Sequence, residues 1–495
     1  MMYGEEKSDS LIVAAKLANN PQGAESVERR SGAKGNAEQP HMRRTQSRES
    51  MSQRLSRVRE AAKQRKKERF TALFHLLTAE ALENAFLSLS RKAAAGVDGV
   101  RWKDYAENLK VNIADLHRRL HQGSYRAQPG RRHYIPKADG KQRPLGIASL
   151  EDKIVQYALV KILNAVYEND FMGFSYGFRP GRSQHNALDA LATGLVRTNV
   201  NRVLDADISQ FFDKVSHEWL IRFIEHRIGD QRVIRLIRKW LTAGTSEEGE
   251  WRASEEGTPQ GAVISPLLAN IYLHYVFDLW AHQWRRRHAT GNVVMVRYAD
   301  DIVIGFDKRI DAQCFRIAMQ RRLKEFGLTV HPKKTRLMEF GRFAAENRAS
   351  RGKGKPETFN FLGFTHISGK DRSGRFMLIR KTRRDRMTAT LKAIKDGLRK
   401  RWHYSIPEQG KWLRRVVQGY LNYHSVPGNY PMMRKFRIYV TDLWRRALRR
   451  RSQQDDTTWT KANRLAAVWL PKVRVLHPWP VERFTARHPR QEPGA

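Results

Sequence analysis

VRYADDIVI, residues 296–304, sets two adjacent acids, Asp300 and Asp301, among apolar residues typical of β-strands. The runs 293–296 and 302–304 predict two strands joined by a hairpin, with the acids at its tip. An Asp-Asp pair in such a place is commonly just solvated. Here the strands are expected to be buried, and ionised carboxylates held beside a core need a cation. The stretch therefore predicts a cation site.

A second acidic strand precedes the hairpin in the chain. Residues 203–213 read VLDADISQFFD, and the two-residue period of a strand puts Asp205 and Asp207 on one face. Asp207 with Asp300 and Asp301 would provide oxygen ligands and no His or Cys, a set suited to Mg²⁺. Two such ions, roughly 3.5–4 Å apart, can hold the attacking and leaving oxygens of a phosphoryl transfer. For Asp205 we expect a place at the strand end, outside the site.

The composition indicates a polyanionic partner. The 495 residues are enough for about three domains at ~150 residues each, and 92 Lys and Arg against 50 Asp and Glu give a net charge of +42. Charge of this size in a compact fold favours nucleic-acid binding. A hydrophobic fraction of 40% excludes wholesale disorder. The single cysteine, Cys314, excludes disulfide frameworks and Cys-ligated zinc.

The N-terminal region reads as an arm. Residues 1–68 are predicted to be basic and disordered, because residues 1–40 are small and polar and Arg43–Arg69 holds 11 Lys and Arg against three acids. A helix that orders on RNA and a solvated linker are the alternatives for the second stretch. Signal-peptide features are lacking, and no apolar run approaches the roughly 18 residues of a membrane span, so we expect a cytoplasmic protein.

Strands and helices are mixed over residues 69–370, which predicts an α+β layout. One hairpin is expected between Arg132 and Ile147, around the turn residues Asp139 and Gly140. From residue 371 to 451 there are 23 Lys and Arg against five acids, and helices are predicted at 383–402, 409–424 and 431–451. Basic helices punctuated by Trp suit contact with an RNA backbone and base stacking, although most of these Trp residues are expected to be core.

The last of these helices ends in a cluster of arginines. Arg445 and Arg449 are four residues apart, as are Arg446 and Arg450, so each pair shares a helix face. We predict that these four residues bind RNA phosphates; a solvated charged face is the alternative.

The motifs of the chain resemble those of reverse transcriptases. YADD at 298–301 is similar to the family's YADD box. The other blocks similar to the family's are, in chain order, YIPK at 134–137 with RPLGI at 143–147, SYGFRPGRS at 175–183, DISQFFD at 207–213, GTPQG at 257–261 with SPLLAN at 265–270, KT at 334–335 and FLGF at 361–364. Seven ordered blocks imply a right-hand polymerase with fingers and palm in residues 69–370.

Further blocks resemble the group II intron-encoded branch of the family. GVDG at 96–99 is similar to its N-terminal block, and GYLNYHSVPGN at 419–429 looks like its maturase (X) domain, supported by RSQ at 451–453 and LHPWP at 476–480. The resemblance implies an α-helical basic thumb and maturase domain over residues 371–485, then a tail at 486–495. Without cysteine pairs, the sequence predicts the lineage that lacks an HNH endonuclease domain.

The resemblance also implies roles for particular residues. Asp207, Asp300 and Asp301 become the catalytic metal-binding acids, with the Ile208 carbonyl as a further ligand. Phe212 takes the place of the steric gate that rejects a ribose 2′-OH. Four residues are expected to contact the incoming nucleotide: Lys137, Arg143, Gln260 and Lys334, with Lys333 as the competitor of the last.

The expected function is RNA-directed DNA synthesis with Mg²⁺ and dNTPs on a primer-template, coupled to splicing and retrohoming of a group II intron RNA into a DNA target. The expected form is a cytoplasmic ribonucleoprotein without membrane contact. Two alternatives stay open: a domesticated reverse transcriptase in phage defence or repair, and a splicing factor that only binds RNA. The block at 419–429 disfavours the first, and the intact acids disfavour the second.

Overall fold

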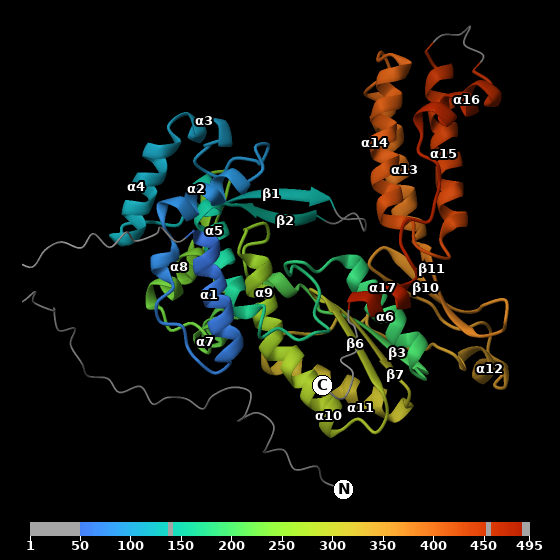
Figure 1. The fold of residues 1–495 in the computed structure, drawn as a ribbon, viewed down its shortest axis with the longest axis horizontal. Helices are drawn as coiled ribbons and strands as arrows, with labels where there is room; N and C mark the ends of the chain where they lie inside the picture. Colours follow the sequence, from blue (N-terminus) through green and yellow to red (C-terminus); the bar gives the residue numbers. More distant parts are fainter. Residues whose placement is uncertain (1–49, 137–141, 452–456, 488–495) are drawn as a thin grey trace, which may run out of the picture. The chain divides into compact units, whose positions relative to one another are not determined.

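The computed structural model describes residues 50–136, 142–451 and 457–487, and these residues form two compact units (Figure 1). The first unit takes the chain up to Phe171 and then Val215–Trp280. The second takes Met172–Lys214 and the chain from Ala281 onward. Each unit is therefore assembled from segments that are distant in the sequence.

The first unit is mainly helical and holds a small sheet. Its helices are α1 (Met51–Gln64), α2 (Ala79–Ser88), α3 (Trp102–Glu107), α4 (Leu109–His121), α5 (Leu150–Tyr167), α7 (His217–Glu225), α8 (Gln231–Thr242) and α9 (Ser265–Leu273), and α10 (Leu279–Arg287) crosses into the second unit. The strands β1 (Gly130–Pro136), β2 (Gln142–Ile147), β4 (Thr245–Glu247) and β5 (Glu250–Arg252) form a sheet in the order β2-β1-β4-β5.

Helix α1 corrects the prediction of a disordered arm through residue 68. Ser50 caps the helix, and α1 packs against α5. The Arg227 guanidinium donates hydrogen bonds to the carbonyls of Ala62, Arg65 and Glu68. These bonds satisfy the end of a helix whose own composition is too polar to predict packing. Residues 1–49 of the predicted arm lie outside the described residues.

The expected hairpin between Arg132 and Ile147 is present as β1 and β2. The two strands pair antiparallel, with Ile135 opposite Arg143. The turn that joins them, and with it Lys137, lies outside the described residues.

The second unit is built around a sheet in the order β6-β7-β3-β8. Its strands are β3 (Arg202–Asp207), β6 (Val293–Tyr298), β7 (Asp301–Phe306) and β8 (Arg336–Glu339), accompanied by α6 (Gln184–Arg197), α11 (Arg309–Glu325), α12 (Ala344–Ala349) and α17 (Pro480–Arg487). Strand β3 pairs antiparallel with both β7 and β8. The two acidic stretches of the sequence are thus neighbouring strands, which confirms the predicted α+β layout.

One face of this sheet changes from apolar to acidic along its strands. Leu188 and Leu191 of α6 share a core cluster with Val203 and Val303. Because side chains alternate along a strand, the residues two and four positions beyond Val203 lie on the same face, and both are Asp. The helix-covered core therefore fixes the strand register that carries the acids.

A second sheet, in the order β11-β10-β9, follows in the same unit. Its strands are β9 (Phe359–Phe361), β10 (Phe364–Lys370) and β11 (Phe376–Thr382). The change of structure predicted at residue 371 is therefore placed too early, because β11 continues this sheet and the first helix of the basic region begins at Arg384. The boundary was predicted from the basic residues in 371–383, whereas the strand pairing is set by backbone hydrogen bonds.

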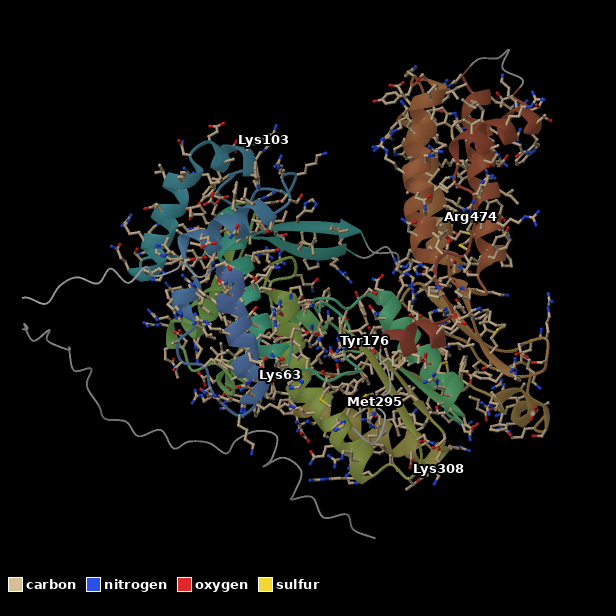
Figure 2. The ribbon with its side chains drawn as sticks, viewed as in Figure 1. Lys63, Lys103, Tyr176, Met295, Lys308 and Arg474 are labelled. Atoms are coloured by element: carbon tan, nitrogen blue, oxygen red, sulfur yellow. The ribbon has the colours of Figure 1, made fainter. Side chains whose placement is uncertain are left out.

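The basic region is helical, as expected from the sequence. It consists of α13 (Arg384–Arg399), α14 (Ile406–His424), α15 (Tyr430–Arg449) and α16 (Trp459–Trp469). Trp444 lies in its core and donates its indole N–H to Gln409 Oε1 at 2.9 Å, whereas Trp402 and Trp459 are exposed. Figure 2 shows many nitrogen-bearing side chains projecting outward from these helices. In the part of the chain that the structure describes, no helix is long and apolar enough to cross a membrane.

A buried histidine gives the second unit a pH-dependent stability. Burial, and then the nearby Arg380 guanidinium, lower the pKa of His366 to about 3, and its ring stacks on Phe359 at 4.7 Å. In the unfolded chain a His titrates near ~6.5, so between these values the unfolded state binds the extra proton. The contribution of His366 to the free energy of unfolding is therefore full above about pH 6.5. Below that pH the free energy of unfolding falls by up to ~1.4 kcal/mol per pH unit.

We expect His366→Phe, which keeps a stacking ring and cannot be protonated, to flatten the fall of the thermal unfolding midpoint on acidification from about pH 7 to about pH 5. The midpoint of the full chain, followed by circular dichroism at several pH values, measures this. The matched control is His403→Phe at an exposed position. An unchanged slope in His366→Phe would show that this ring does not contribute.

Candidate catalytic site

The three acids predicted to bind metal meet at one end of the main sheet of the second unit. Asp207 is the last residue of β3 and lies opposite Asp301, the first residue of β7. Asp300 occupies the turn between β6 and β7, where Tyr298 also lies opposite Asp301. Strand register, rather than any side-chain contact, thus brings together residues almost a hundred positions apart in the sequence.

Burial and mutual repulsion disfavour the ionised form of the carboxylates at this end of the sheet. Burial, followed by the charges of Asp205, Asp300 and Asp207, holds the pKa of Asp301 well above its usual range. Burial also raises the pKa of Asp205 to about 6; the charge of Asp207 acts in the same direction, whereas Arg336 and Arg383 oppose the rise. Such shifts arise where carboxylates share a desolvated site.

The expectation that Asp205 lies outside the site is therefore wrong. Its backbone pairs with Val303 and Arg336 on the neighbouring strands. A diagonal neighbour across two strands lies within electrostatic reach, and Asp205 stands in that relation to Asp301. The two-residue period had placed Asp205 on the face of Asp207, and this signal was sufficient to include it.

Lys334 supplies a positive charge to the acids. The chain at 329–335 runs beside the end of β3: Ser209 N–H donates to Thr329 O at 2.8 Å, and His331 N–H donates to Asp207 O at 2.7 Å. This arrangement places the Lys334 ammonium 2.8 Å from Asp207 Oδ2. Within the described residues, Lys333 makes no comparable contact, so the geometry favours Lys334 of the two lysines.

The turn that carries Asp300 depends on a buried arginine that the sequence reasoning did not single out. Ala299 has a φ of 57°, an unusual conformation for a residue with a side chain. The Arg297 guanidinium, fully buried, donates to Ala299 O at 3.0 Å and to Ser175 Oγ at 2.7 Å. Arg297 thus ties the turn to the segment that precedes α6. An Arg in an otherwise apolar strand was the available sign.

The same segment approaches the turn too closely for a side chain. A Cβ on Gly177 would lie 2.4 Å from the backbone nitrogen of Ala299. Tyr176 N–H donates to Arg297 O at 2.9 Å, and Ser175 forms a parallel bridge with Arg297. The block at 175–183 therefore serves to support the acidic hairpin.

Phe212 lies among aromatic side chains beside the acids. Its ring meets Phe178 at 6.5 Å and Phe211 at 5.4 Å, edge to face in both cases, and Phe178 lies 6.4 Å from Tyr298. Phe178 itself is 49% exposed and has a φ of 58°. A strained, exposed aromatic residue next to Phe212 is typical of a binding surface rather than a core.

The acids fit a hard divalent cation by their chemistry. Within the described residues, no three His, Cys, Asp or Glu side chains are already closed around a common point as a metal-ligand set. The donors are nevertheless carboxylate oxygens alone, which suits such a cation. Burial first, and then the neighbouring carboxylates, raise the pKa of Asp301, so a cation at this place would be stabilised by the ionised acids; the Lys334 ammonium already contacts Asp207.

Two of the residues predicted to contact the nucleotide belong to the first unit, and their geometry is described there. Arg143 lies in β2 opposite Ile135. Gln260 accepts a hydrogen bond at its carbonyl from Gly146 N–H at 2.7 Å, so its loop is fastened to β2. Gly261 next to it has a φ of 107°, where a Cβ would meet Gly146 O at 3.1 Å.

The four arginines at the end of α15 are not equivalent. Arg445 has a side chain only 16% exposed, forms an ion pair with Asp442 at 2.9 Å and lies over the Trp459 ring at 4.9 Å. It is therefore a packing residue, which corrects its prediction as a phosphate contact. Arg446 is 67% exposed although paired with Asp442, and Arg449 and Arg450 are exposed.

Comparison with known families identifies the domain that holds these features. Residues 135–366 match the family model described as reverse transcriptase (RNA-dependent DNA polymerase). The chain therefore contains a reverse transcriptase domain, and the acidic hairpin, β3 and the block at 175–183 all lie inside it. This match confirms that residues 135–366 have the predicted reverse transcriptase fold.

The similar proteins point to intron-encoded members of this family. The chain is 43% identical over 206 residues to Protein YkfC of Escherichia coli (strain K12), which is 41% of this chain and 54% of YkfC. It is 37% identical over 223 residues to the Group II intron-encoded protein LtrA of Lactococcus lactis subsp. cremoris, which is 44% of this chain and 37% of LtrA. It is 26% identical over 393 residues to the putative COX1/OXI3 intron 1 protein of Saccharomyces cerevisiae, which is 66% of this chain and 46% of that protein.

The predicted resemblance to group II intron-encoded reverse transcriptases is thereby confirmed. The chain spans about half, or less, of the length of these curated relatives, from 54% down to 37%. Reverse transcriptases generally use divalent metal ions, in agreement with the all-oxygen donor set of the acids.

The support of the turn by Arg297 can be tested directly. Arg297→Met keeps the length of the side chain and removes both hydrogen bonds, so the acids should shift. We expect kcat for primer extension to fall by at least about tenfold, because a displacement of ~1 Å in a catalytic group can cost about 10². Steady-state kinetics should show a smaller change in the dNTP KM. Arg297→Lys, the charge-preserving control, should retain more activity; equal activity of all three proteins would contradict the role.

Proposed function

We propose that this chain is an RNA-directed DNA polymerase and maturase that binds a group II intron RNA, assists its splicing and copies it into DNA during retrohoming. The observation that carries the proposal is the cluster of Asp207, Asp300 and Asp301 at the end of one sheet, inside a reverse transcriptase domain. The names of the similar proteins, among them an intron-encoded protein, support the intron as the source of the RNA.

The acids would hold Mg²⁺ in this proposal, with the Ile208 carbonyl as a further ligand. Bound Mg²⁺ supplies Lewis-acid stabilisation of the charge that develops on the attacking and leaving oxygens. The chain's part is to keep three carboxylates at fixed positions, which the β3–β7 register and the Arg297-supported turn accomplish. The primer 3′-OH attacks the α-phosphate of the dNTP, and pyrophosphate leaves.

The cationic residues would act on the triphosphate. The Lys334 ammonium is paired with Asp207. When a triphosphate binds there, the same ammonium would pair with a phosphate in place of the carboxylate. We assign Lys137 and Arg143 to the leaving pyrophosphate, whose charge they neutralise, and Gln260 to contact with the nucleotide.

The helical region would bind RNA and a primer-template duplex through phosphate contacts. Its exposed cations include Arg446, Arg449 and Arg450, which we retain as proposed RNA contacts. Binding through phosphates weakens steeply with salt, so this step should depend on ionic strength much more than the chemical step does. We propose a ribonucleoprotein in the cytoplasm, with a DNA target and dNTPs as the further partners.

The polymerase assignment is tested by removal of one acid. Asp300→Ala should lower primer extension on an RNA template by at least about 10²–10³, the effect of one electrostatic stabiliser. RNA binding, measured by filter retention, should barely change because cations dominate it. The control is Glu346→Ala, an exposed acid in α12. Extension by Asp300→Ala within about tenfold of wild type would sink the assignment; a splicing factor that only binds RNA would show no extension even before mutation.

The choice of sugar is tested at Phe212. A ring in this position excludes a 2′-OH by its bulk, so Phe212→Val should raise the ratio of rNTP to dNTP incorporation and leave dNTP use nearly intact. Single-nucleotide incorporation kinetics measure both rates. Phe211→Val, a change at the buried neighbouring ring, serves as the control for loss of packing. If discrimination does not move in Phe212→Val, the steric assignment fails.

A further inference from the structure

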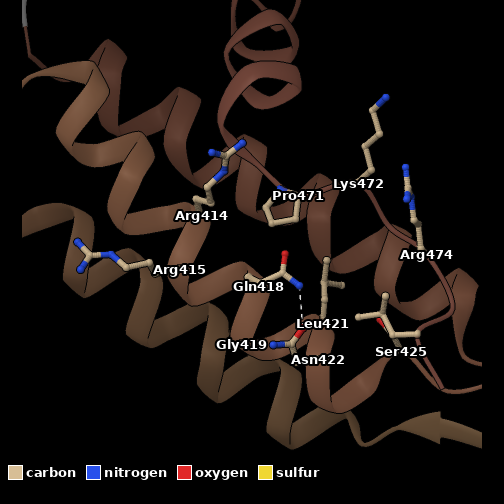
Figure 3. Close-up of a pocket in the computed structure, with 11 residues that line it drawn as sticks. Arg414, Arg415, Gln418, Gly419, Leu421, Asn422, Ser425, Pro471, Lys472 and Arg474 are labelled. Atoms are coloured by element: carbon tan, nitrogen blue, oxygen red, sulfur yellow. Dashed lines mark hydrogen bonds between the residues drawn. The ribbon is translucent and has the colours of Figure 1, made fainter.

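A cavity of about 800 Å³ lies in the helical region, between α14 and the extended segment that follows α16. Figure 3 shows Arg414 on one side of it and Lys472 and Arg474 on the other, with Gln418 and Asn422 between them. Its volume falls within the roughly 300–1,000 Å³ that small-ligand sites occupy. None of the described residues that line the cavity is an acid, so its chemistry is cationic and amide.

Four cations line this cavity, and one of them, Arg415, donates its Nε–H to Lys411 O at 3.4 Å. In the described part of the chain, no hydrogen bond or ion pair holds the side chains of Arg414, Lys472 or Arg474. By contrast, Arg437 on the neighbouring helix donates to Pro471 O and Ala466 O. Convergent cations without internal partners are the usual form of a phosphate site.

The floor of the cavity contains a glycine that packing does not explain. Three other glycines inside helices of this unit each face a side chain that leaves no room for a Cβ: Gly194 faces Val294, Gly397 faces Trp412 and Gly410 faces Trp469, all at 2.4–2.5 Å. A Cβ on Gly419 would meet nothing within 4 Å. Glycine inside a helix is less stable than alanine. The α14 backbone at Gly419 is therefore open toward the cavity, with room for a flat group to lie directly against it.

The amides beside Gly419 form a polar pair with one free donor and one free acceptor edge. Gln418 Nε2 donates to Asn422 Oδ1 at 2.7 Å, drawn as the dashed line in Figure 3. This bond leaves Gln418 Oε1 as an acceptor and Asn422 Nδ2 as a donor. A donor next to an acceptor is the pattern with which Gln and Asn read the edge of a nucleobase.

The opposite wall is anchored at both ends but keeps its polar backbone available. Arg437 holds the start of the segment at Pro471 O, and Leu476 N–H and His477 N–H both donate to Ser425 O, at 3.0 and 3.2 Å. Between these anchors, within the described residues, the backbone amides of 472–475 donate no hydrogen bond inside the protein. They add donors to the cationic wall.

We propose that this cavity holds an unpaired nucleotide of an RNA strand, with its base edge on the Gln418–Asn422 pair, its ring plane against Gly419 and its flanking phosphates on Arg414, Lys472 and Arg474. A duplex offers no base that can enter the cavity, because its bases are paired and stacked. The inference rests on the proposed RNA-binding function and adds to it a site that recognises a single unpaired base, apart from the arginines of α15.

The experiment fills the cavity without harming the helix. Gly419→Leu introduces a strong helix former where a Cβ meets open space, so the thermal midpoint of the full chain should stay level or rise. Affinity for a fluorescein-labelled single-stranded RNA of about ten nucleotides should fall by about tenfold, the scale of one lost base contact. Affinity for a blunt RNA duplex of the same length should change less. Asn463→Leu, on the exposed face of α16, is the matched control.

A second variant and a mapping step keep the outcome decisive. The double variant Arg414→Gln, Arg474→Gln should weaken single-strand binding and flatten its dependence on salt by about two units, one for each phosphate contact. A 4-thiouridine in the same RNA should crosslink to residues 414–425 or 471–476. Single-strand affinity equal to wild type in Gly419→Leu, with crosslinks elsewhere, would overturn the inference. Wild-type protein that neither extends a primer nor binds RNA would instead overturn the proposed function.

Discussion

The repulsion among four carboxylates at one end of a sheet is the constraint on which the second unit depends. Asp205, Asp207, Asp300 and Asp301 are held by strand register and by one turn, so the protein cannot relieve the repulsion by moving them apart. Lys334 pairs with Asp207, and the charges of Arg336 and Arg383 also oppose the repulsion. The pKa of Asp301 nevertheless stays raised. A site of this kind is stable only because the apolar core under α6 fixes its strands.

The supports of the acids are as important as the acids. The turn at Ala299 has a backbone conformation that costs free energy, and the buried guanidinium of Arg297 compensates by two hydrogen bonds. Gly177 allows the backbone of the block at 175–183 to lie directly against this turn. The block at 175–183, which the sequence marked only as a family motif, supports the hairpin at this point. Loss of this support should therefore resemble partial loss of an acid.

Much of this site could be predicted from the sequence, because strands are recognisable by their two-residue period and their apolar content. The hairpin at 293–306, the strand before it and the helices of the basic region all lie close to their predicted places. Arg297 could not be assigned, since its partners lie at Ala299 and 122 residues away at Ser175. The packing of helix α1 could not be predicted for the same reason, because Arg227, which binds the end of the helix, belongs to a distant segment. Composition alone cannot show such long-range bonds.

Positive charge in this chain falls into two kinds, and the difference matters for RNA. Arg445 and Arg437 are held by partners inside the protein and stabilise it. Among the residues that the structure describes, Arg414 and Arg474 have no such partner, and they line a cavity. A net charge of +42 therefore overstates the surface available for phosphates, and spacing on a helix does not separate the two kinds. What separates them is the neighbour: an acid or a carbonyl retains the cation, whereas a glycine and two amides leave room for a nucleotide. The specificity of RNA binding should thus reside where cations and empty backbone coincide, and its bulk affinity elsewhere.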